Sequence, residues 1–302
     1  MTAADNPDRS DEIAAVIAFW RGLGLPGIVD VHTHFMPDPV MRKVWEYFEA
    51  GGPLIGGPWP ISYRDDELTR LNLLREFGVR AFTALVYPHK PGMAEWLNAW
   101  SAEFAARSPG CLQTATFFPE PNALWYTTAA IEAGARVFKA HLQVGNYNPA
   151  DPALDDVWGL LEDSGVPVVI HCGSDPVPGK FTGVEPMRAL LHRHPNLPVI
   201  VAHLGSPEFV EFLDLAEEFP AIYLDTTMVF TDFTERMAAF PRTELDRLAD
   251  FSNRILFGSD FPNIPYRYLD ALTGLPGAEL GEDWLRRVCY HNGAELFALH
   301  EN

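Results

Sequence analysis

Apolar runs alternate with amphipathic segments along most of the chain. Several runs are apolar at consecutive positions, such as Val168-Val169-Ile170 and Val199-Ile200-Val201, which is typical of parallel strands covered on both faces. These runs predict eight strands, at 27–35, 80–87, 112–118, 136–144, 167–172, 198–204, 221–226 and 255–259. Helical periodicity between them predicts helices that include 66–77, 93–106, 154–164, 184–194 and 207–219. This alternation favours an α/β fold of the (β/α)8 TIM-barrel type over a doubly wound open sheet.

The segment before the first predicted strand reads as an extension of the barrel. Residues 1–11 are polar and acidic, and they lack the basic start and the long apolar run of a signal peptide. The apolar stretch 13–20 is too short to span a bilayer and predicts an amphipathic helix capped by Ser10. We therefore expect a helical extension over 1–26 and a single barrel domain over 27–302.

One predicted connection, 35–65, is unusually long and rich in proline and glycine. Long loops that follow barrel strands are often lids or binding loops. Trp45, Phe48 and Trp59 in this stretch either cover a pocket or only fill space in a packed excursion.

Composition narrows the class of protein and of partner. A formal charge of −19 and a pI near 4.8 argue against nucleic acid and anionic membranes as partners. Cys111, Cys172 and Cys289 have no CxxC spacing, so they support neither a disulfide framework nor a cysteine zinc site. They fit a reducing compartment. We expect a cytoplasmic protein that acts on a small molecule, and homo-oligomerisation stays open.

Two histidines follow the first apolar run, in Asp30-Val31-His32-Thr33-His34. Residues two apart in a strand point to the same face, so His32 and His34 would project together. Two imidazoles on one face are half of a metal site. A His-x-His pair alone is also compatible with two unrelated surface or core histidines, so the other ligands must come from elsewhere in the chain.

Ionisable residues also close three later strands. His171 ends the fifth predicted strand, His203 ends the sixth and Asp260 ends the eighth. A polar residue that closes an apolar strand is costly to bury unless it is paired or binds a ligand. The C-terminal ends of barrel strands meet at one axial pocket. Together with His32 and His34, these residues predict a metal site there.

These motifs resemble those of a known family. Asp30-Val31-His32-Thr33-His34, the strand-final His171 and His203, and Gly258-Ser259-Asp260-Phe261-Pro262 look like the motifs of the amidohydrolase superfamily. The similarity is greatest to the amidohydrolase-related (amidohydrolase 2) branch, which includes aminocarboxymuconate-semialdehyde decarboxylase. The segment 290–297 also looks like the last helix of that branch. The resemblance covers most of the chain and indicates the superfamily, but not the substrate.

The resemblance implies the ligands of one divalent metal ion, namely His32, His34, His171 and Asp260. His203 would be a catalytic histidine, acting as a general acid/base or as a polariser of the substrate, and a ligand only beside a second metal. Asp260 would also be catalytic, because it can take a proton from a water molecule whose pKa the metal lowers. Zinc is the preferred ion, with manganese and iron as alternatives.

The fourth predicted strand carries Lys139 and His141 on one face. In two-metal members of the superfamily a lysine here is carboxylated, whereas the Lys-x-His pattern looks more like the single-metal branch. Lys139 is then a candidate to bind a substrate carboxylate or carbonyl. The alternative is a lysine paired with a barrel carboxylate such as Asp225. His141 lies either beside the site or in the core as a hydrogen-bonded histidine.

The ligand set is compatible with two reactions. The first expectation is a metal-dependent hydrolase that attacks a small molecule through a metal-activated water. The alternative is a metal-dependent, non-oxidative decarboxylase of an aromatic or unsaturated carboxylic acid, which needs cationic groups for the carboxylate. A barrel with a purely structural ion fits less well, because such a ligand set leaves a coordination position open.

Overall fold

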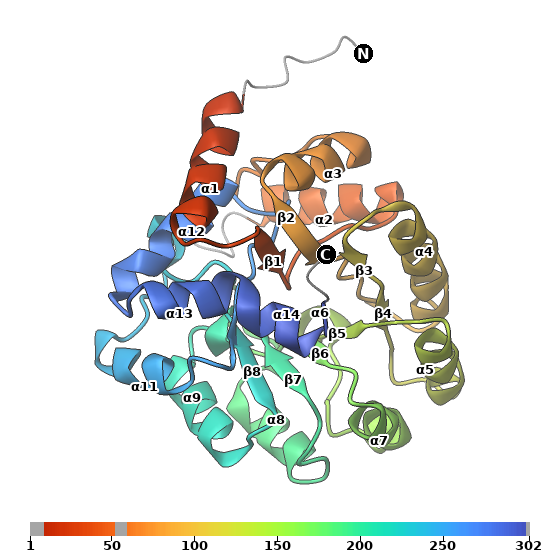
Figure 1. Cartoon of the computed structure of the whole chain (residues 1–302). Helices are drawn as coiled ribbons and strands as arrows, with labels where there is room; N and C mark the ends of the chain where they lie inside the picture. Colours follow the sequence, from red (N-terminus) through yellow and green to blue (C-terminus); the bar gives the residue numbers. More distant parts are fainter. Residues whose placement is uncertain (1–8, 52–58, 300–302) are drawn as a thin grey trace.

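Parallel strands form a ring in the computed structural model of the chain, which describes residues 9–51 and 59–299 (Figure 1). Neighbours pair in chain order, β1 to β3 in one sheet and β4 to β9 in the other. Gln113 separates β3 from β4, so these two short segments act as one barrel strand. The strands are β1 (Ile28–Asp30), β2 (Val79–Thr83), β3 (Cys111–Leu112), β4 (Thr114–Thr116), β5 (Val137–His141), β6 (Val168–His171), β7 (Val199–Val201), β8 (Ile222–Asp225) and β9 (Ile255–Leu256).

The last strand meets the first, which closes the ring. The Val31 amide donates to the Phe257 carbonyl at 2.9 Å, and Thr33 bridges to Phe261 in parallel register. The Asp260 amide also donates to the His32 carbonyl at 2.8 Å. The predicted TIM barrel is therefore confirmed, and the open-sheet alternative is wrong.

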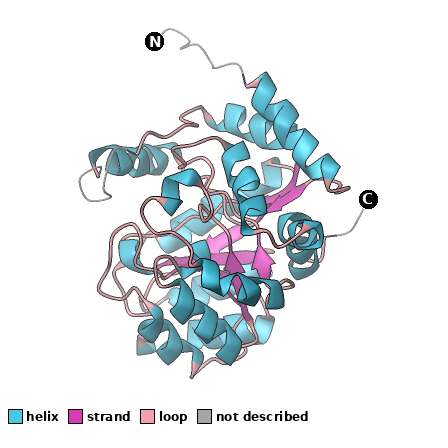
Figure 2. Ribbon diagram, turned by 90° about the vertical axis from the view of Figure 1, so that its left-hand side faces the viewer, coloured by secondary structure: helices cyan, strands magenta, loops and turns pink. Residues whose placement is uncertain are grey.

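Helices surround this ring, and most of the long loops lie on one side of it (Figure 2). The predicted helices correspond to α3, α4, α7, α8 and α9, whose observed bounds differ from the predicted ones by a few residues at most. The α-helices on the outside are α3 (Glu67–Glu76), α4 (Ala94–Arg107), α5 (Ala123–Glu132), α7 (Asp155–Ser164), α8 (Val184–Leu191), α9 (Phe209–Glu218), α11 (Leu245–Asp250), α12 (Tyr268–Gly274), α13 (Glu282–Arg286) and α14 (Asn292–Leu296). Short helices α6 (Leu142–Gly145) and α10 (Asp232–Glu235) follow β5 and β8.

The core lies between the strands and this helical layer. Val168, Val169 and Ile170 of β6 are fully buried, as expected for a strand covered on both faces. Trp158 of α7 is also fully buried, and its ring packs edge-on against Phe117 with centroids 4.7 Å apart. The packed core fixes where each strand ends, and so it positions the side chains that follow the strands.

The N-terminal helix α1 (Ser10–Gly22) is attached to the barrel by buried polar contacts. Glu12 accepts a hydrogen bond from the Tyr63 hydroxyl at 2.6 Å and another from the Leu269 amide at 3.3 Å. The expected cap is wrong by one position, because Ser10 is the first helical residue and Arg9 precedes it. The division into an extension of 1–26 and a barrel domain of 27–302 stays a prediction, and residues 1–8 and 300–302 lie outside the described part.

The long connection after β1 contains a helix that the sequence pattern did not predict, α2 (Asp38–Ala50). One face of α2 packs into the protein through Met41 and Trp45, both buried. Trp45 donates its indole N–H to Asn263 Oδ1 at 2.9 Å, and Trp59 donates to the Asn263 carbonyl at 2.7 Å. The part of this connection at 52–58 lies outside the described residues. No described helix is both long enough and apolar enough to cross a membrane.

Candidate active site

His32 and His34 lie just past the end of β1, and hydrogen bonds fix both rings. His32 Nδ1 lies 2.9 Å from Asp225 Oδ2, and His34 Nδ1 lies 2.8 Å from the Leu85 carbonyl. Because carboxylate and carbonyl oxygens only accept, each Nδ1 carries the proton and donates it. Each Nε2 is then left with a free lone pair, which is the arrangement that orients histidine ligands around a metal.

Asp260 brings a carboxylate to the same place from the end of β9. Its Oδ1 lies 2.9 Å from His34 Nε2 and 3.7 Å from His32 Nε2. Ligand atoms of His32, His34 and Asp260 all lie within 4.8 Å of one another, and the three residues are buried. Two imidazole nitrogens with free lone pairs and one carboxylate oxygen are ligands that fit a divalent transition metal.

Asp260 has a left-handed backbone conformation, and its amide donates to the His32 carbonyl. Its φ of 67° is in the left-handed region, where only Asp, Asn and Gly are at all common. Burial works to raise the pKa of Asp260, but the neighbouring imidazole rings of His34, His32 and His203 lower it to about 2. Asp260 is therefore a carboxylate at neutral pH, able to bind a cation or accept a proton.

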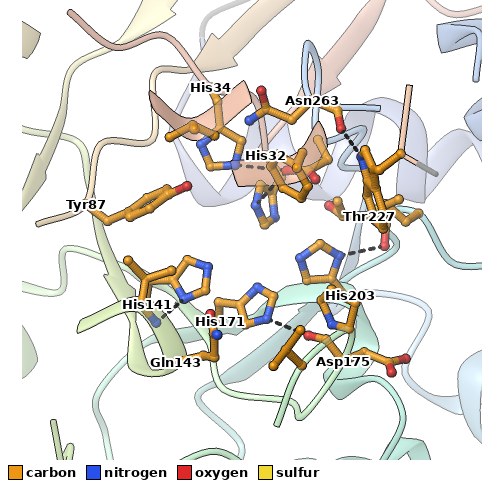
Figure 3. A pocket seen from close by; sticks show the side chains of 18 of the residues that line it. His32, His34, Tyr87, His141, Gln143, His171, Asp175, His203, Thr227 and Asn263 are labelled. Atoms are coloured by element: carbon orange, nitrogen blue, oxygen red, sulfur yellow. Dashed lines mark hydrogen bonds and ion pairs between the residues drawn. The ribbon is translucent and has the colours of Figure 1, made fainter. Parts of the chain in front are cut away.

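His203 and His171 face the same space from β7 and β6 (Figure 3). His203 Nδ1 lies 3.1 Å from the Thr227 carbonyl, which leaves Nε2 as a proton acceptor. His171 Nε2 lies 3.0 Å from the Asp175 carbonyl, which leaves its Nδ1 with the lone pair. The two rings are 4.9 Å apart between centroids, and the His203 ring is 5.0 Å from that of His32.

Among the described residues, His171 is not part of the tight group formed by His32, His34 and Asp260. Its ring stacks instead on His141, with centroids 4.1 Å apart and an interplanar angle of 10°. The role of His171 as a fourth ligand therefore stays a prediction. His141 is placed beside the site, at the side of the cavity that Tyr87 also faces (Figure 3).

Burial favours the neutral form of three histidines of the site. Loss of solvent lowers the pKa of His32, His171 and His203 below the ordinary histidine value. The charge of Lys139 lowers the pKa of His32 further. Neutral imidazole is the form that binds metals and accepts protons, so these shifts suit both uses.

Lys139 lies at the floor of the site and is fully buried. Its Nζ is 3.4 Å from His32 Nε2, and among the described residues no ion pair within 4.0 Å joins it to Asp225. Burial lowers the pKa of Lys139 to about 8, although the charges of Asp225 and Asp260 oppose the shift. The geometry therefore favours a lysine that faces the site over one that is neutralised by Asp225.

Asp225, at the end of β8, connects two of the predicted site residues. Its Oδ2 accepts from His32, while its Oδ1 accepts from the backbone amides of His203 at 2.9 Å and Thr227 at 3.1 Å. These bonds support the left-handed backbone at His203, whose φ is 57°. Sequence reasoning considered Asp225 only as a partner for Lys139. Its place at the end of a strand was the one signal that could have indicated this role.

Asp30, the last residue of β1, connects the segments that follow β1 and β9 through hydrogen bonds. Its Oδ1 accepts from the backbone amides of His32 and Ser259, each at 3.2 Å, and its Oδ2 accepts from the Tyr268 hydroxyl at 2.9 Å. Burial raises the pKa of Asp30 to about 7, although the hydrogen bonds it accepts lower it. Asp30 thus joins the two chain segments that carry His32 and Asp260.

A cavity of about 560 Å³ opens above these residues. Its floor carries the five histidines, Lys139 and Asp260, and its upper walls come from α2, Trp59 and the segment after β8. Phe48 and Trp59 line the cavity and stack on each other with centroids 5.1 Å apart, whereas Trp45 packs behind them. Phe48 and Trp59 therefore cover the pocket, whereas Trp45 fills space in the packed connection.

Two comparisons with solved structures describe the same fold. A probable 2-pyrone-4,6-dicarboxylic acid hydrolase from Acinetobacter baumannii has a TM-score of 0.61 at 14% identity, over 90% of this chain and 100% of that one. A 5-carboxyvanillate decarboxylase from Novosphingobium aromaticivorans has a TM-score of 0.60 at 13% identity, over 91% and 97%. At these identities the structures show the barrel and do not distinguish between their two reactions.

Sequence comparison gives a relative and a family. The 6-methylsalicylic acid decarboxylase of Penicillium expansum is 25% identical over 334 aligned positions, which cover 89% of this chain and 95% of the fungal protein. The sequence profile of the amidohydrolase family matches residues 29–299, which includes every residue of the site described above. The chain therefore belongs to the amidohydrolase family and is an enzyme of the amidohydrolase superfamily, as its motifs predicted.

Proposed function

We propose that this enzyme is a metal-dependent, non-oxidative decarboxylase of an aromatic carboxylic acid. The observation that carries the proposal is the match to a 6-methylsalicylic acid decarboxylase along nearly the whole of both chains. The first expectation from the sequence was a hydrolase, and this relative favours the alternative. The buried Lys139 supports it, because a cation beside the site is what a substrate carboxylate requires.

His32, His34 and Asp260 would hold the metal, with His171 as the candidate fourth ligand. When bound, a divalent cation holds the oxygens of the acid and stabilises negative charge that develops on them. Zinc is the ion we propose, with manganese and iron as the alternatives. Manganese is the stronger of these alternatives, because the structure of the decarboxylase from Novosphingobium aromaticivorans contains that ion.

Lys139 would position the carboxylate of the acid. Its ammonium group is buried, so a charge-assisted hydrogen bond to a carboxylate is stronger there than in water. Asp260 is ionised and cannot donate a proton, so its part in this reaction is that of a ligand. The catalytic proton transfer then rests on another group.

His203 is the group we propose for that transfer. Its Nε2 accepts, because its Nδ1 donates to the Thr227 carbonyl. In a 2-hydroxybenzoic acid, Nε2 takes the hydroxyl proton and delivers it to the ring carbon that bears the carboxylate. The carbon–carboxylate bond then breaks, carbon dioxide leaves, and the bond's electron pair returns through the ring to the oxygen. The resulting phenolate takes a proton from solvent, which balances the reaction.

A direct assay tests this function. The purified protein is supplied with zinc or manganese and incubated with 6-methylsalicylic acid and other 2-hydroxybenzoic acids, and released carbon dioxide is measured. A chelator-treated sample is the control, and aryl esters and lactones are screened in parallel. Carbon dioxide release that requires metal supports the proposal. Hydrolysis of esters or lactones with no decarboxylation would show that the enzyme is a hydrolase instead.

Three finer expectations belong to this proposal as well. We keep the cytoplasmic location, which the three unpaired cysteines favour. We also keep a small molecule as the partner, with no role for nucleic acid, since the chain carries a net charge of −19. Homo-oligomerisation stays open.

A further inference from the structure

The cavity above the site is divided into a polar floor and apolar walls. Histidines, Lys139 and Asp260 gather at the floor, at the ends of the barrel strands. Its volume of about 560 Å³ lies well inside the range of about 300–1,000 Å³ that holds drug-sized ligands. A single benzene ring with its carboxylate would use the floor and leave much of the upper part unfilled.

One apolar wall is a stripe along α2. Val40, Val44 and Phe48 recur at a spacing of four residues, so they lie on the same face of the helix. All three line the cavity and are only half-buried, whereas Met41 and Trp45 on the adjoining face are buried in the protein. The stripe therefore presents apolar surface to the cavity that the described part of the chain does not cover.

A second apolar wall comes from the segment that follows β8. Met228 and Val229 are buried at the cavity wall, while Met237 lies at its mouth and is 46% exposed. Methionine is flexible and adapts to apolar groups of different shape. A cavity lined by the valines of α2 and by the methionines of this segment suits an unbranched apolar chain.

Charge is scarce in this upper part. Apart from histidines, the cationic residues among the described lining are Lys139 at the floor and Lys43 at the rim. The Lys43 side chain is 78% exposed and pairs with Glu46 at 2.5 Å, so it is hydrated and already neutralised. The described part of the walls offers no buried cation to hold a second carboxylate.

We infer that the preferred substrate is an aromatic acid with a single carboxylate and an apolar substituent of several carbons. The carboxylate and ring occupy the floor, and the substituent lies between the α2 stripe and the methionine wall. This inference rests on the proposed decarboxylase function for the identity of the head group. The walls themselves argue for the substituent. Burial of each added methylene contributes about 0.8 kcal/mol, so binding should tighten by about fourfold per carbon.

The test measures binding and turnover along a series of chain lengths. Dissociation constants of 3-methyl-, 3-propyl- and 3-pentylphenol, the expected products, are measured by calorimetry on the metal-loaded enzyme. In parallel, kcat/KM is measured for salicylic acids with the same substituents at the 6- or the 4-position, both of which give these phenols. We expect the affinity of the phenols to rise at least tenfold from methyl to pentyl, and kcat/KM to rise at least tenfold in one of the two acid series.

A variant pair shows whether the α2 stripe is responsible. Val44→Asn places an amide in the stripe, so the pentyl-to-methyl ratios of affinity and of kcat/KM should fall towards one. Arg42→Asn makes a similar change on an exposed position of the same helix and should leave the ratio as it is. Equal effects of both variants on the ratio would contradict the assignment of the stripe.

The outcomes separate this inference from the function on which it rests. Decarboxylation of 6-methylsalicylic acid, with no gain from longer substituents in either series, would overturn the inference and leave the function standing. Phenol binding that tightens with chain length, with no carbon dioxide from any acid, would support the role of the apolar walls and overturn the function alone. Equally good turnover of a dicarboxylic acid would also overturn the inference.

Discussion

Asp225 Oδ2 lies 2.9 Å from His32 Nδ1, although 193 residues separate the two in the chain. This contact sets the tautomer of His32 and directs the lone pair of Nε2 towards His34 and Asp260. The other oxygen of Asp225 is taken by two backbone amides, which include that of His203. One carboxylate therefore orients a proposed metal ligand and also supports the backbone of the proposed catalytic histidine.

Asp225→Asn should weaken metal binding by about 10–100-fold, the usual effect of losing a residue that orients a ligand. The amide oxygen must face the two backbone N–H groups, so the amide NH2 faces His32 Nδ1. His32 then has to accept at Nδ1 and carry its proton at Nε2, where the metal would bind. Chelator competition measures the affinity. Thr227→Val is the control, because its buried hydroxyl has no hydrogen-bond partner among the described residues. An unchanged metal affinity in Asp225→Asn would show that Asp225 does not orient His32.

Removing a ligand and removing the proposed proton carrier should have different effects. Asp260→Ala and His32→Ala should each lose both the metal and activity. His203→Asn should keep most of the metal while kcat falls by about 10²–10⁴-fold, the usual contribution of general acid–base catalysis. Elemental analysis and steady-state kinetics on the same preparations separate the two cases. Full metal content and turnover in Asp260→Ala would be incompatible with the proposed site.

Lys139→Met should weaken recognition of the acid while leaving the product's affinity within about twofold, since a phenol carries no carboxylate. A hydrogen bond to a charged group contributes about 1.5–3 kcal/mol, so kcat/KM for the acid should fall by about 10–150-fold. Methionine has a similar volume and no charge, and the fold should tolerate it because a buried charge is removed. An unchanged kcat/KM would show that Lys139 does not contact the substrate.

A prediction on stability concerns the start of α3. Asp66 caps this helix by accepting a hydrogen bond from the Thr69 amide at 2.8 Å, which lowers the pKa of Asp66 from the model-peptide value of 3.8. Asp66→Ala should reduce the free energy of unfolding by about 1 kcal/mol, whereas Asp66→Asn keeps an acceptor and should cost less. Denaturant unfolding measures both.

The effect of Asp66→Ala should also depend on pH. Because folding lowers the pKa of Asp66, the stabilisation is present above the unfolded pKa, near 3.8, and is lost as the pH falls through the lower folded value. The difference between the wild-type protein and Asp66→Ala should therefore shrink below about pH 4. A difference that stays constant down to pH 2 would show that the ionised carboxylate does not act as the cap.

Local patterns were enough to predict the barrel and most of the candidate site. Consecutive apolar residues in 168–170 and 199–201 indicated buried parallel strands, and the ionisable residues that close them indicated where chemistry gathers. The convergence of His32, His34 and Asp260 followed from the barrel, because strand ends meet at one face. The sequence did not predict that His171 lies outside the tight group. A place at the end of a strand does not fix how far a side chain lies from His32, His34 and Asp260.

What could not be predicted depends on contacts between distant segments. Asn263 is fixed by the indole groups of Trp45 and Trp59, which are 218 and 204 residues away. The helix α2 is a different case, because its own 38–50 stretch has a clear apolar face, a local signal that the surrounding prolines and glycines obscured. The double role of Asp225 likewise requires three elements to be brought together, and no local pattern carries that information.

Decarboxylation in deuterium oxide tests the central claim most directly. Metal-loaded enzyme is given 6-methylsalicylic acid, and carbon dioxide and the isotopic composition of the phenol are measured together. The account predicts one carbon dioxide for each 3-methylphenol formed, with one deuterium at C2, the carbon that lost the carboxylate. An enzyme that releases no carbon dioxide from any aromatic acid while it cleaves an ester or a lactone would contradict the account.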